Sequence, residues 1–176
     1  MSLIIGVDSY VTLEEADAYH ESMGDSAQWP GGASDDKTIK KKEAALRKAA
    51  SFIDLAVSGK WRGRKAKAGQ PLAWPRIEAY DGDGYLIPYN VIPRCVKNAA
   101  CEAAFRIYGG EDLMPDETGR NIASESVAGA VTVSYFEGKS SATEYTRIYK
   151  MLDDVLIAPI GSGTKIIFST RGYEPF

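Results

Sequence analysis

The spacing of hydrophobic residues along the chain predicts four helices. The clearest is expected over residues 36–58, where hydrophobic positions recur every three or four residues and therefore share one helix face. These positions are Leu46, Ala49, Ala50, Ile53, Ala56 and Val57. Similar spacing predicts three further helices, near residues 12–24, 92–109 and 143–157.

Residues at the ends of these segments support the same helices. Thr12 can cap the first helix with its hydroxyl, and Glu15 stands three residues later, as in a capping box. Pro93 is expected at the first position of the third helix, where its missing N–H does no harm. Gly59 and Gly109 are expected to end the second and third helices.

Signals for β-strands are few. Residues 129–136 alternate and contain β-branched side chains, which predicts one strand, and residues 165–169 are a candidate for a short terminal one. The expected fold is therefore mainly α, a small bundle of about four helices with long loops and a minor β strand or hairpin. Residues 1–160 are expected to form a single helical domain and residues 161–176 a C-terminal tail.

Charge is distributed unevenly along the chain, although the net charge is only −3. Residues 1–36 contain acidic residues and no Lys or Arg, whereas residues 37–67 contain eleven basic residues and only Glu43 and Asp54 as acids. Such a basic block favours a surface that faces an anion, most often nucleic acid. An equally good interpretation is a solvated helix face whose lysines neutralise the acidic N-terminal segment. The overall pI of about 5.3 does not favour a dedicated DNA-binding protein.

Two short motifs resemble ligand-binding loops but lack a required residue. A Gly-Lys-Ser sequence at residues 138–140 follows a predicted strand, yet Val133 occupies the place where a phosphate-binding loop needs glycine. An Asp-Gly-Asp-Gly sequence at residues 81–84 resembles the start of a calcium loop, but Ile92 occupies the position of the bidentate glutamate. The sequence predicts a turn at each place, and neither a nucleotide nor a calcium ion.

Residues that could carry catalysis or bind a metal are scarce. His20 is the only histidine, and a surface position beside Asp17 and Glu21 suffices to explain it. Cys95 and Cys101 are expected on one helix, about 240° apart around its axis, so they cannot share a metal. We therefore predict no catalytic residue, no metal and no cofactor, and the chain is not expected to be an enzyme.

The sequence also bears on location. Its longest hydrophobic run, residues 155–160, is far shorter than the roughly 20 residues that cross a bilayer. No basic stretch followed by a hydrophobic one opens the chain, so no signal peptide is predicted. A soluble protein of a reducing compartment, without a membrane partner, is expected.

Several stretches together resemble a known family. They are Tyr10–Tyr19, Lys42–Asp54, Lys60–Arg64, Gln70–Arg76, and the Ile-Pro pairs at residues 87–88 and 92–93. In this order they resemble a tailed-bacteriophage family encoded among head genes, whose members look like head–tail connector (adaptor or head-completion) proteins. The same family is also catalogued as DnaT-like single-stranded-DNA-binding proteins. The resemblance covers about residues 8–160, and its most specific element is the Trp-Pro-Arg sequence at residues 74–76.

The resemblance implies a structural adaptor of a phage or prophage. Such a protein assembles as a homo-oligomeric ring of about a dozen copies beneath the portal protein, with a stopper or tail protein below it. Its location would be the head–tail junction of the virion, and the host cytoplasm before assembly. This connector role is the main functional prediction, with non-specific DNA contact as an addition. The alternative is a DnaT-like module that binds single-stranded DNA.

A long loop, residues 60–76, carries the candidate binding residues, because it has no hydrophobic period and contains several glycines. The candidates for nucleic-acid contact are Lys60, Arg62, Arg64, Lys65 and Lys67. The candidates for a subunit interface are Trp61, Leu72, Trp74, Pro75 and Arg76. We expect this loop to be mobile in the monomer and to become ordered between subunits; alternatively, Trp74 packs on its own domain and the loop is an ordered wrap.

Overall fold

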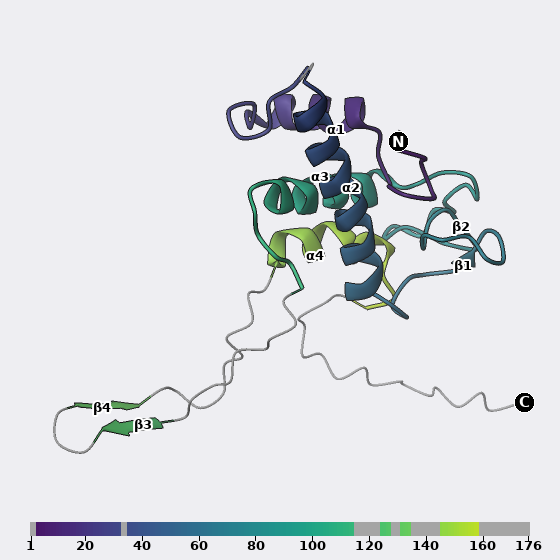
Figure 1. Ribbon diagram of the computed structural model, residues 1–176. Helices are drawn as coiled ribbons and strands as arrows, with labels where there is room; N and C mark the ends of the chain where they lie inside the picture. Colours follow the sequence, from purple (N-terminus) through teal and green to yellow (C-terminus); the bar gives the residue numbers. More distant parts are fainter. Residues whose placement is uncertain (1–2, 33–34, 115–123, 128–130, 135–144, 159–176) are drawn as a thin grey trace, which may run out of the picture.

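Four α-helices dominate the part of the chain that the computed structural model describes, which is residues 3–32, 35–114, 124–127, 131–134 and 145–158 (Figure 1). The helices are α1 (Leu13–Met23), α2 (Asp36–Ala56), α3 (Arg94–Tyr108) and α4 (Thr146–Leu152), and the 3₁₀-helix η1 (Asp153–Val155) follows α4. The antiparallel strand pairs are β1 (Arg64–Lys65) with β2 (Arg76–Ile77), and β3 (Ser124–Val127) with β4 (Val131–Ser134). The predicted mainly α fold with a minor β element is confirmed.

Side-chain caps determine where the first two helices begin. The Thr12 hydroxyl accepts a hydrogen bond from the Glu15 N–H at 3.0 Å, and the Glu15 carboxylate accepts one from the Thr12 N–H at 3.0 Å, which confirms the predicted capping box. Asp35 caps α2 by accepting from the Thr38 N–H at 2.8 Å. Helix α3 begins one residue later than expected, because Pro93 is its N-cap rather than its first helical residue.

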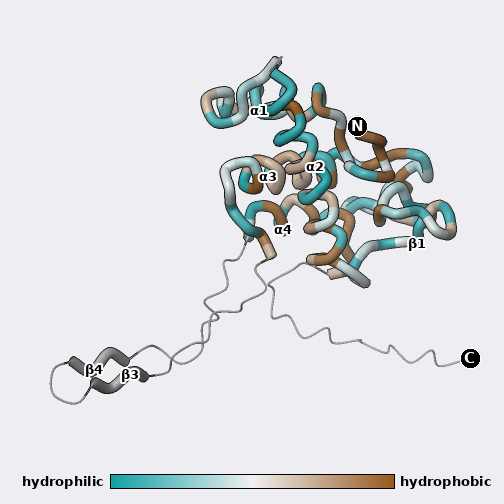
Figure 2. The backbone as a smooth tube through the Cα atoms, in the orientation of Figure 1, coloured by the Kyte–Doolittle hydropathy of each residue, from teal (hydrophilic) through white to brown (hydrophobic). Residues whose placement is uncertain are grey.

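The core lies where α2 crosses α3. Figure 1 shows α1, α3 and α4 stacked in that order, with α2 running across α3. Ala49 and Ala50 of α2 and Ala99 and Ala100 of α3 are fully buried, and these small side chains let the two helices approach closely. In contrast to this buried part, the N-terminal part of α2 is hydrophilic (Figure 2). The hydrophobic face predicted for α2 is therefore the face that it buries.

Buried polar side chains join α1 to this core. Lys42 of α2 is fully buried, and its ammonium group lies 2.6 Å from the Asp17 carboxylate of α1. Here a lysine of the basic block does neutralise an acid of the N-terminal segment. His20 is also fully buried, with Nδ1 3.2 Å from Asp25 and Nε2 3.2 Å from the Cys101 carbonyl. The predicted surface position of His20 is wrong, because its ring packs among aromatic side chains of α1, α3 and the loop after α1.

The later elements differ in detail from the predicted ones. The strand expected over residues 129–136 is present as β4, and it pairs with β3 in a stretch where no strand was expected. Helix α4 is shorter than the predicted 143–157 segment, since its last turn is the 3₁₀-helix η1. The candidate strand at residues 165–169 and the C-terminal tail at 161–176 lie outside the described residues.

Candidate nucleic-acid interface

The segment from Lys60 to Ile77 is a hairpin held by one buried arginine. Arg76 is only 8% exposed, and its guanidinium donates hydrogen bonds to three backbone carbonyls. These are the carbonyls of Arg62 at 2.7 Å, Gly63 at 2.6 Å and Ala73 at 3.2 Å. Because the three acceptors stand on both arms of the hairpin, Arg76 fixes the arms relative to each other.

The tip of the hairpin is closed by the side chain of Gln70. Its amide oxygen accepts from the Lys67 N–H at 3.0 Å, and its amide nitrogen donates to the Leu72 and Pro75 carbonyls, each at 2.9 Å. The Lys65 ammonium donates to the Gln70 and Pro71 carbonyls at 3.0 and 3.3 Å. The loop expected to be mobile is therefore an ordered wrap.

The aromatic residues of this hairpin belong to the core of their own chain. Trp74 is fully buried, Trp61 is 6% exposed, and their rings meet edge to face at 5.9 Å. Leu72 and Arg76 are also buried, and Pro75 is half-buried. Residues proposed for a subunit interface thus have their partners within the chain, and the packing alternative describes them.

The first arm of the hairpin also pairs with the chain that follows α4. Trp61 and Leu156 form an antiparallel bridge. The Arg62 N–H donates to the Val155 carbonyl at 3.1 Å, and the Ile157 N–H donates to the Lys60 carbonyl at 2.8 Å. The backbone of the first arm is therefore held on two sides.

A half-buried carboxylate links the hairpin to α2 and to the N-terminal segment. Asp54 accepts a hydrogen bond from the Tyr10 hydroxyl and another, at 2.8 Å, from the Ala73 N–H. Burial raises the pKa of Asp54 above its ordinary value, although both hydrogen bonds act in the opposite direction. Burial and the neighbouring carboxylate also raise the pKa of Tyr10. This contact could not be predicted from local sequence patterns, because Tyr10 and Asp54 are 44 residues apart.

Four of the five residues predicted to contact nucleic acid are exposed together on this hairpin. They are Lys60, Arg64, Lys65 and Lys67. Arg64 pairs with the exposed Glu78 at 3.2 Å, whereas neither Lys60 nor Lys67 has an ion-pair partner among the described residues. The fifth, Arg62, is half-buried and donates to the Tyr80 and Asp81 carbonyls, so it holds the neighbouring segment in place. We call residues 60–67 the cationic segment.

The rest of the basic block lies elsewhere on the molecule. Lys37, Lys40 and Lys41 stand at the N-terminal end of α2, and a helix of 21 residues is about 30 Å long. Lys40 pairs with Asp36 at 2.5 Å, and Lys41 lies 4.2 Å above the ring of Tyr108. The run of basic residues in the sequence therefore does not form one patch.

A second short hairpin lies against the cationic segment. The Ile87 N–H donates to the Ala79 carbonyl at 2.9 Å, and the Asp81 N–H donates to the Tyr85 carbonyl at 3.0 Å. The Asp81 carboxylate accepts from the Asp83 and Tyr85 N–H groups, so the predicted turn at residues 81–84 is confirmed. The side chains that it exposes are Tyr80, Tyr85 and Leu86, followed by Tyr89 and Val91.

Gly63 allows this second hairpin to approach the first. Its φ is +66°, and a Cβ atom there would lie 2.3 Å from the Ile77 carbonyl oxygen and 2.8 Å from the Ala79 nitrogen. Only glycine fits such a backbone contact. The exposed tyrosines were missed as candidates, although one signal was available: three tyrosines stand within ten residues, shortly after the basic block.

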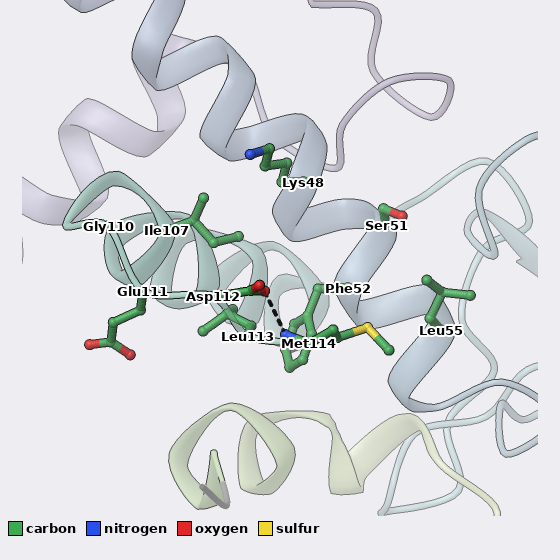
Figure 3. A pocket seen from close by; sticks show the side chains of 10 residues that line it. All are labelled: Lys48, Ser51, Phe52, Leu55, Ile107, Gly110, Glu111, Asp112, Leu113 and Met114. Carbon is green, nitrogen blue, oxygen red and sulfur yellow. Dashed lines mark hydrogen bonds between the residues drawn. The ribbon is translucent and has the colours of Figure 1, made fainter. Parts of the chain in front are cut away.

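A groove elsewhere has the wrong chemistry for a nucleic acid. It encloses about 480 Å³ between α2 and the segment that follows α3 (Figure 3). Lys48 contributes a positive charge to its lining, but Glu111 and Asp112 contribute two negative ones. Asp112 accepts from the Met114 N–H at 3.0 Å, which fixes this acidic side of the groove.

Within the described part of the chain, no group of three His, Cys, Asp or Glu side chains could hold a metal. The described residues also contain no helix that is long and apolar enough to cross a membrane. The Gly-Lys-Ser motif at residues 138–140 lies outside the described residues.

A family model described as "Putative DnaT-like ssDNA binding protein" matches residues 2–172. The chain belongs to this DnaT-like family. No curated protein and no solved structure matches the sequence of this DnaT-like protein.

The family match corrects the main functional prediction. Head–tail connector identity is not supported, because the match over nearly the whole chain is to DnaT-like proteins, which was the stated alternative. The portal, the stopper or tail protein, the ring of subunits and the virion location rested on the connector assignment alone. The family resemblance itself was correct in its DnaT-like part.

Proposed function

We propose that this DnaT-like protein binds single-stranded DNA through the cationic segment. The observation that carries the proposal is the exposure of Lys60, Arg64, Lys65 and Lys67 on one rigid hairpin. Cations that contact phosphates supply affinity for DNA without reading its sequence. The description of the family supports the same ligand.

The hairpin is suited to phosphate binding because its charges are already in place. Arg76 and Gln70 fix its backbone, so little ordering accompanies binding. Within the described ranges, the ammonium groups of Lys60 and Lys67 have no ion pair to break. The Arg64–Glu78 pair is exposed on both sides and is weakened by water and salt, so a phosphate can replace the carboxylate.

The negative net charge does not oppose this proposal, since acids of the N-terminal segment are engaged within the fold. Asp17 pairs with Lys42, Glu15 pairs with Lys97 at 2.5 Å, and Asp25 contacts His20. These pairs lie on α1 and the loop after it, away from the hairpin (Figure 1). We propose a binding function without catalytic turnover.

The test compares two triple variants of equal charge. Lys60→Gln, Arg64→Gln and Lys67→Gln remove three exposed cations of the cationic segment. The matched control removes three lysines of α2 by Lys37→Gln, Lys40→Gln and Lys48→Gln. Binding of a labelled oligothymidylate of about 16 nucleotides is measured by fluorescence anisotropy over a salt series.

We expect the first variant to bind at least tenfold more weakly, and its salt slope to fall by about 2, at about 0.7 for each lost phosphate contact. The control should bind within about twofold of the unmodified protein, since its three lysines lie on α2 and outside the cationic segment. Equal losses in both variants, or no salt-sensitive binding by the unmodified protein, would overturn the proposal.

A further inference from the structure

The tyrosines in the described part of the chain fall into two groups. One group has partners within the protein. Tyr10 bonds to Asp54 and Tyr19 bonds to Glu102, and the rings of three further tyrosines pack against other aromatic rings. These three are Tyr108, Tyr145 and Tyr149. The other group is Tyr80, Tyr85 and Tyr89, which are 47%, 73% and 67% exposed. Among the described residues, the side chains of these three have no hydrogen bond and no ring contact.

The backbone of the second hairpin explains why Tyr80 points outward. Tyr80 and Leu86 face each other across an antiparallel bridge, and side chains alternate between the two faces of a strand. The neighbouring pair, Ala79 and Ile87, faces inward, with Ala79 fully buried. Tyr80 and Leu86 are therefore turned toward solvent, and Tyr85 stands at the end of the adjoining turn.

The backbone that carries Tyr80 is held against the cationic segment. The Arg62 guanidinium bonds to the Tyr80 carbonyl at 3.2 Å and to the Asp81 carbonyl, and Arg64 pairs with Glu78. The backbone contact of Gly63 with residues 77–79 leaves no room for a side chain between the two segments. The exposed Tyr80 thus stands on a backbone that is held against the cationic segment, and the exposed Tyr85 and Tyr89 follow it within nine residues.

We propose that Tyr80, Tyr85 and Tyr89 form the platform on which the bases of single-stranded DNA stack while the cationic segment holds the phosphates. This inference rests on the proposed function and adds the part of the ligand that the rings recognise. Every unpaired base offers a flat face to an aromatic ring, whereas the bases of a duplex are already stacked on one another. The platform therefore selects single strands over duplexes without selecting a sequence.

The experiment uses two oligonucleotides with the same number of phosphates, an oligothymidylate and an abasic strand of equal length. The full chain is compared with Tyr85→Ala/Tyr89→Ala and with Tyr85→Phe/Tyr89→Phe. The matched control is Leu55→Ala/Met114→Ala, which shortens two exposed side chains that line the acidic groove. Binding is measured by anisotropy, and folding by thermal melting.

The unmodified protein should bind oligothymidylate at least tenfold more tightly than the abasic strand. The double alanine variant should lose that preference by binding oligothymidylate more weakly, with abasic binding and the salt slope unchanged. The double phenylalanine variant and the control should keep it. If the double alanine variant does not fold, Tyr89→Ala alone, which lies beyond the hairpin, should reduce the preference several-fold.

Each contrary outcome has a distinct meaning. Equal binding of both strands by the unmodified protein would overturn the stacking platform and leave the phosphate-binding proposal intact. No salt-sensitive binding of either strand would overturn both. If the double alanine variant keeps its preference but loses self-association in sedimentation, the tyrosines contact a second copy of the chain and the inference is wrong.

Discussion

The helical core and the hairpin region, residues 60–91, are ordered by different means. In the core, small hydrophobic residues such as Ala50 and Ala100 are buried at helical spacing, and side-chain packing between α2 and α3 holds the two helices together. In the hairpin region, Arg62, Gln70 and Arg76 donate hydrogen bonds to backbone carbonyls. The core thus depends on the shape of its side chains, whereas the hairpin region depends on a few polar anchors.

This difference explains how the hairpin region can be ordered without a large core of its own. Backbone carbonyls that receive a charged donor are fully satisfied, and a hydrogen bond to a charged group contributes about 1.5–3 kcal/mol. The exposed side chains of the same segment are then free to serve binding. Substitutions in the two regions should therefore have effects of different kind and size.

The largest effect is expected from Arg76→Ala, which removes three hydrogen bonds, two of them to the opposite arm of the first hairpin. The free energy of unfolding should fall by about 3 kcal/mol, because buried carbonyls lose a charged donor. Urea denaturation measures this loss. Arg64→Ala, which removes an exposed ion pair on the same hairpin, is the control and should leave stability close to that of the unmodified protein. Equal effects would show that Arg76 does not anchor the hairpin.

A smaller effect is expected in the core from Ala100→Leu. The added carbons have no space at the buried face of α3, and overpacking of this kind lowers stability by about 1–3 kcal/mol. Thermal and urea unfolding of the variant measure it. The control Ala44→Leu, at an exposed position of α2, should change stability by about 0.5 kcal/mol or less. A neutral Ala100→Leu variant would contradict the close approach of the two helices.

The smallest effect concerns pH and the junction between the two regions. Burial raises the pKa of Asp54 from its ordinary value of 3.8, so the folded protein favours the protonated carboxyl group. The stability that Asp54 contributes is therefore fully present below about pH 4 and is lost as the pH rises through the raised pKa. Asp54→Asn cannot titrate, so the difference in unfolding free energy between the unmodified protein and this variant should shrink over that range. A constant difference from pH 3 to 7 would contradict the raised pKa.

The features that could be predicted from the sequence are those that depend on residues close together in the chain. The α2 face around Ala50 and Ile53, the cap formed by Thr12, and the turn at residues 81–84 depend on neighbours close in sequence. Local spacing is enough to recognise each of them. The four exposed cations of the hairpin were also identifiable, because charge and glycine content already favour exposure.

The rest depends on contacts that local patterns do not encode. Trp61 and Trp74 stand in a polar, glycine-rich stretch, and only the pairing of Trp61 with Leu156 shows that they are buried. Lys42 looks like its exposed neighbours until Asp17 is placed beside it. Tyr19 and Tyr80 are the same residue type. Only the fold shows that the Tyr19 hydroxyl donates to Glu102, whereas the Tyr80 side chain is exposed and has no hydrogen bond to any described residue.

The pairing of the first arm of the hairpin with residues 155–157 has a consequence for biosynthesis. Residues 60–62 leave the ribosome long before residues 155–157, so their backbone groups have no partner strand during most of translation. The last contact of the cationic segment forms only after the chain beyond η1 has emerged. A nascent chain that is still short of this point therefore exposes the basic residues without the backbone pairing that arranges them, and the complete surface proposed to bind DNA is a late product of synthesis.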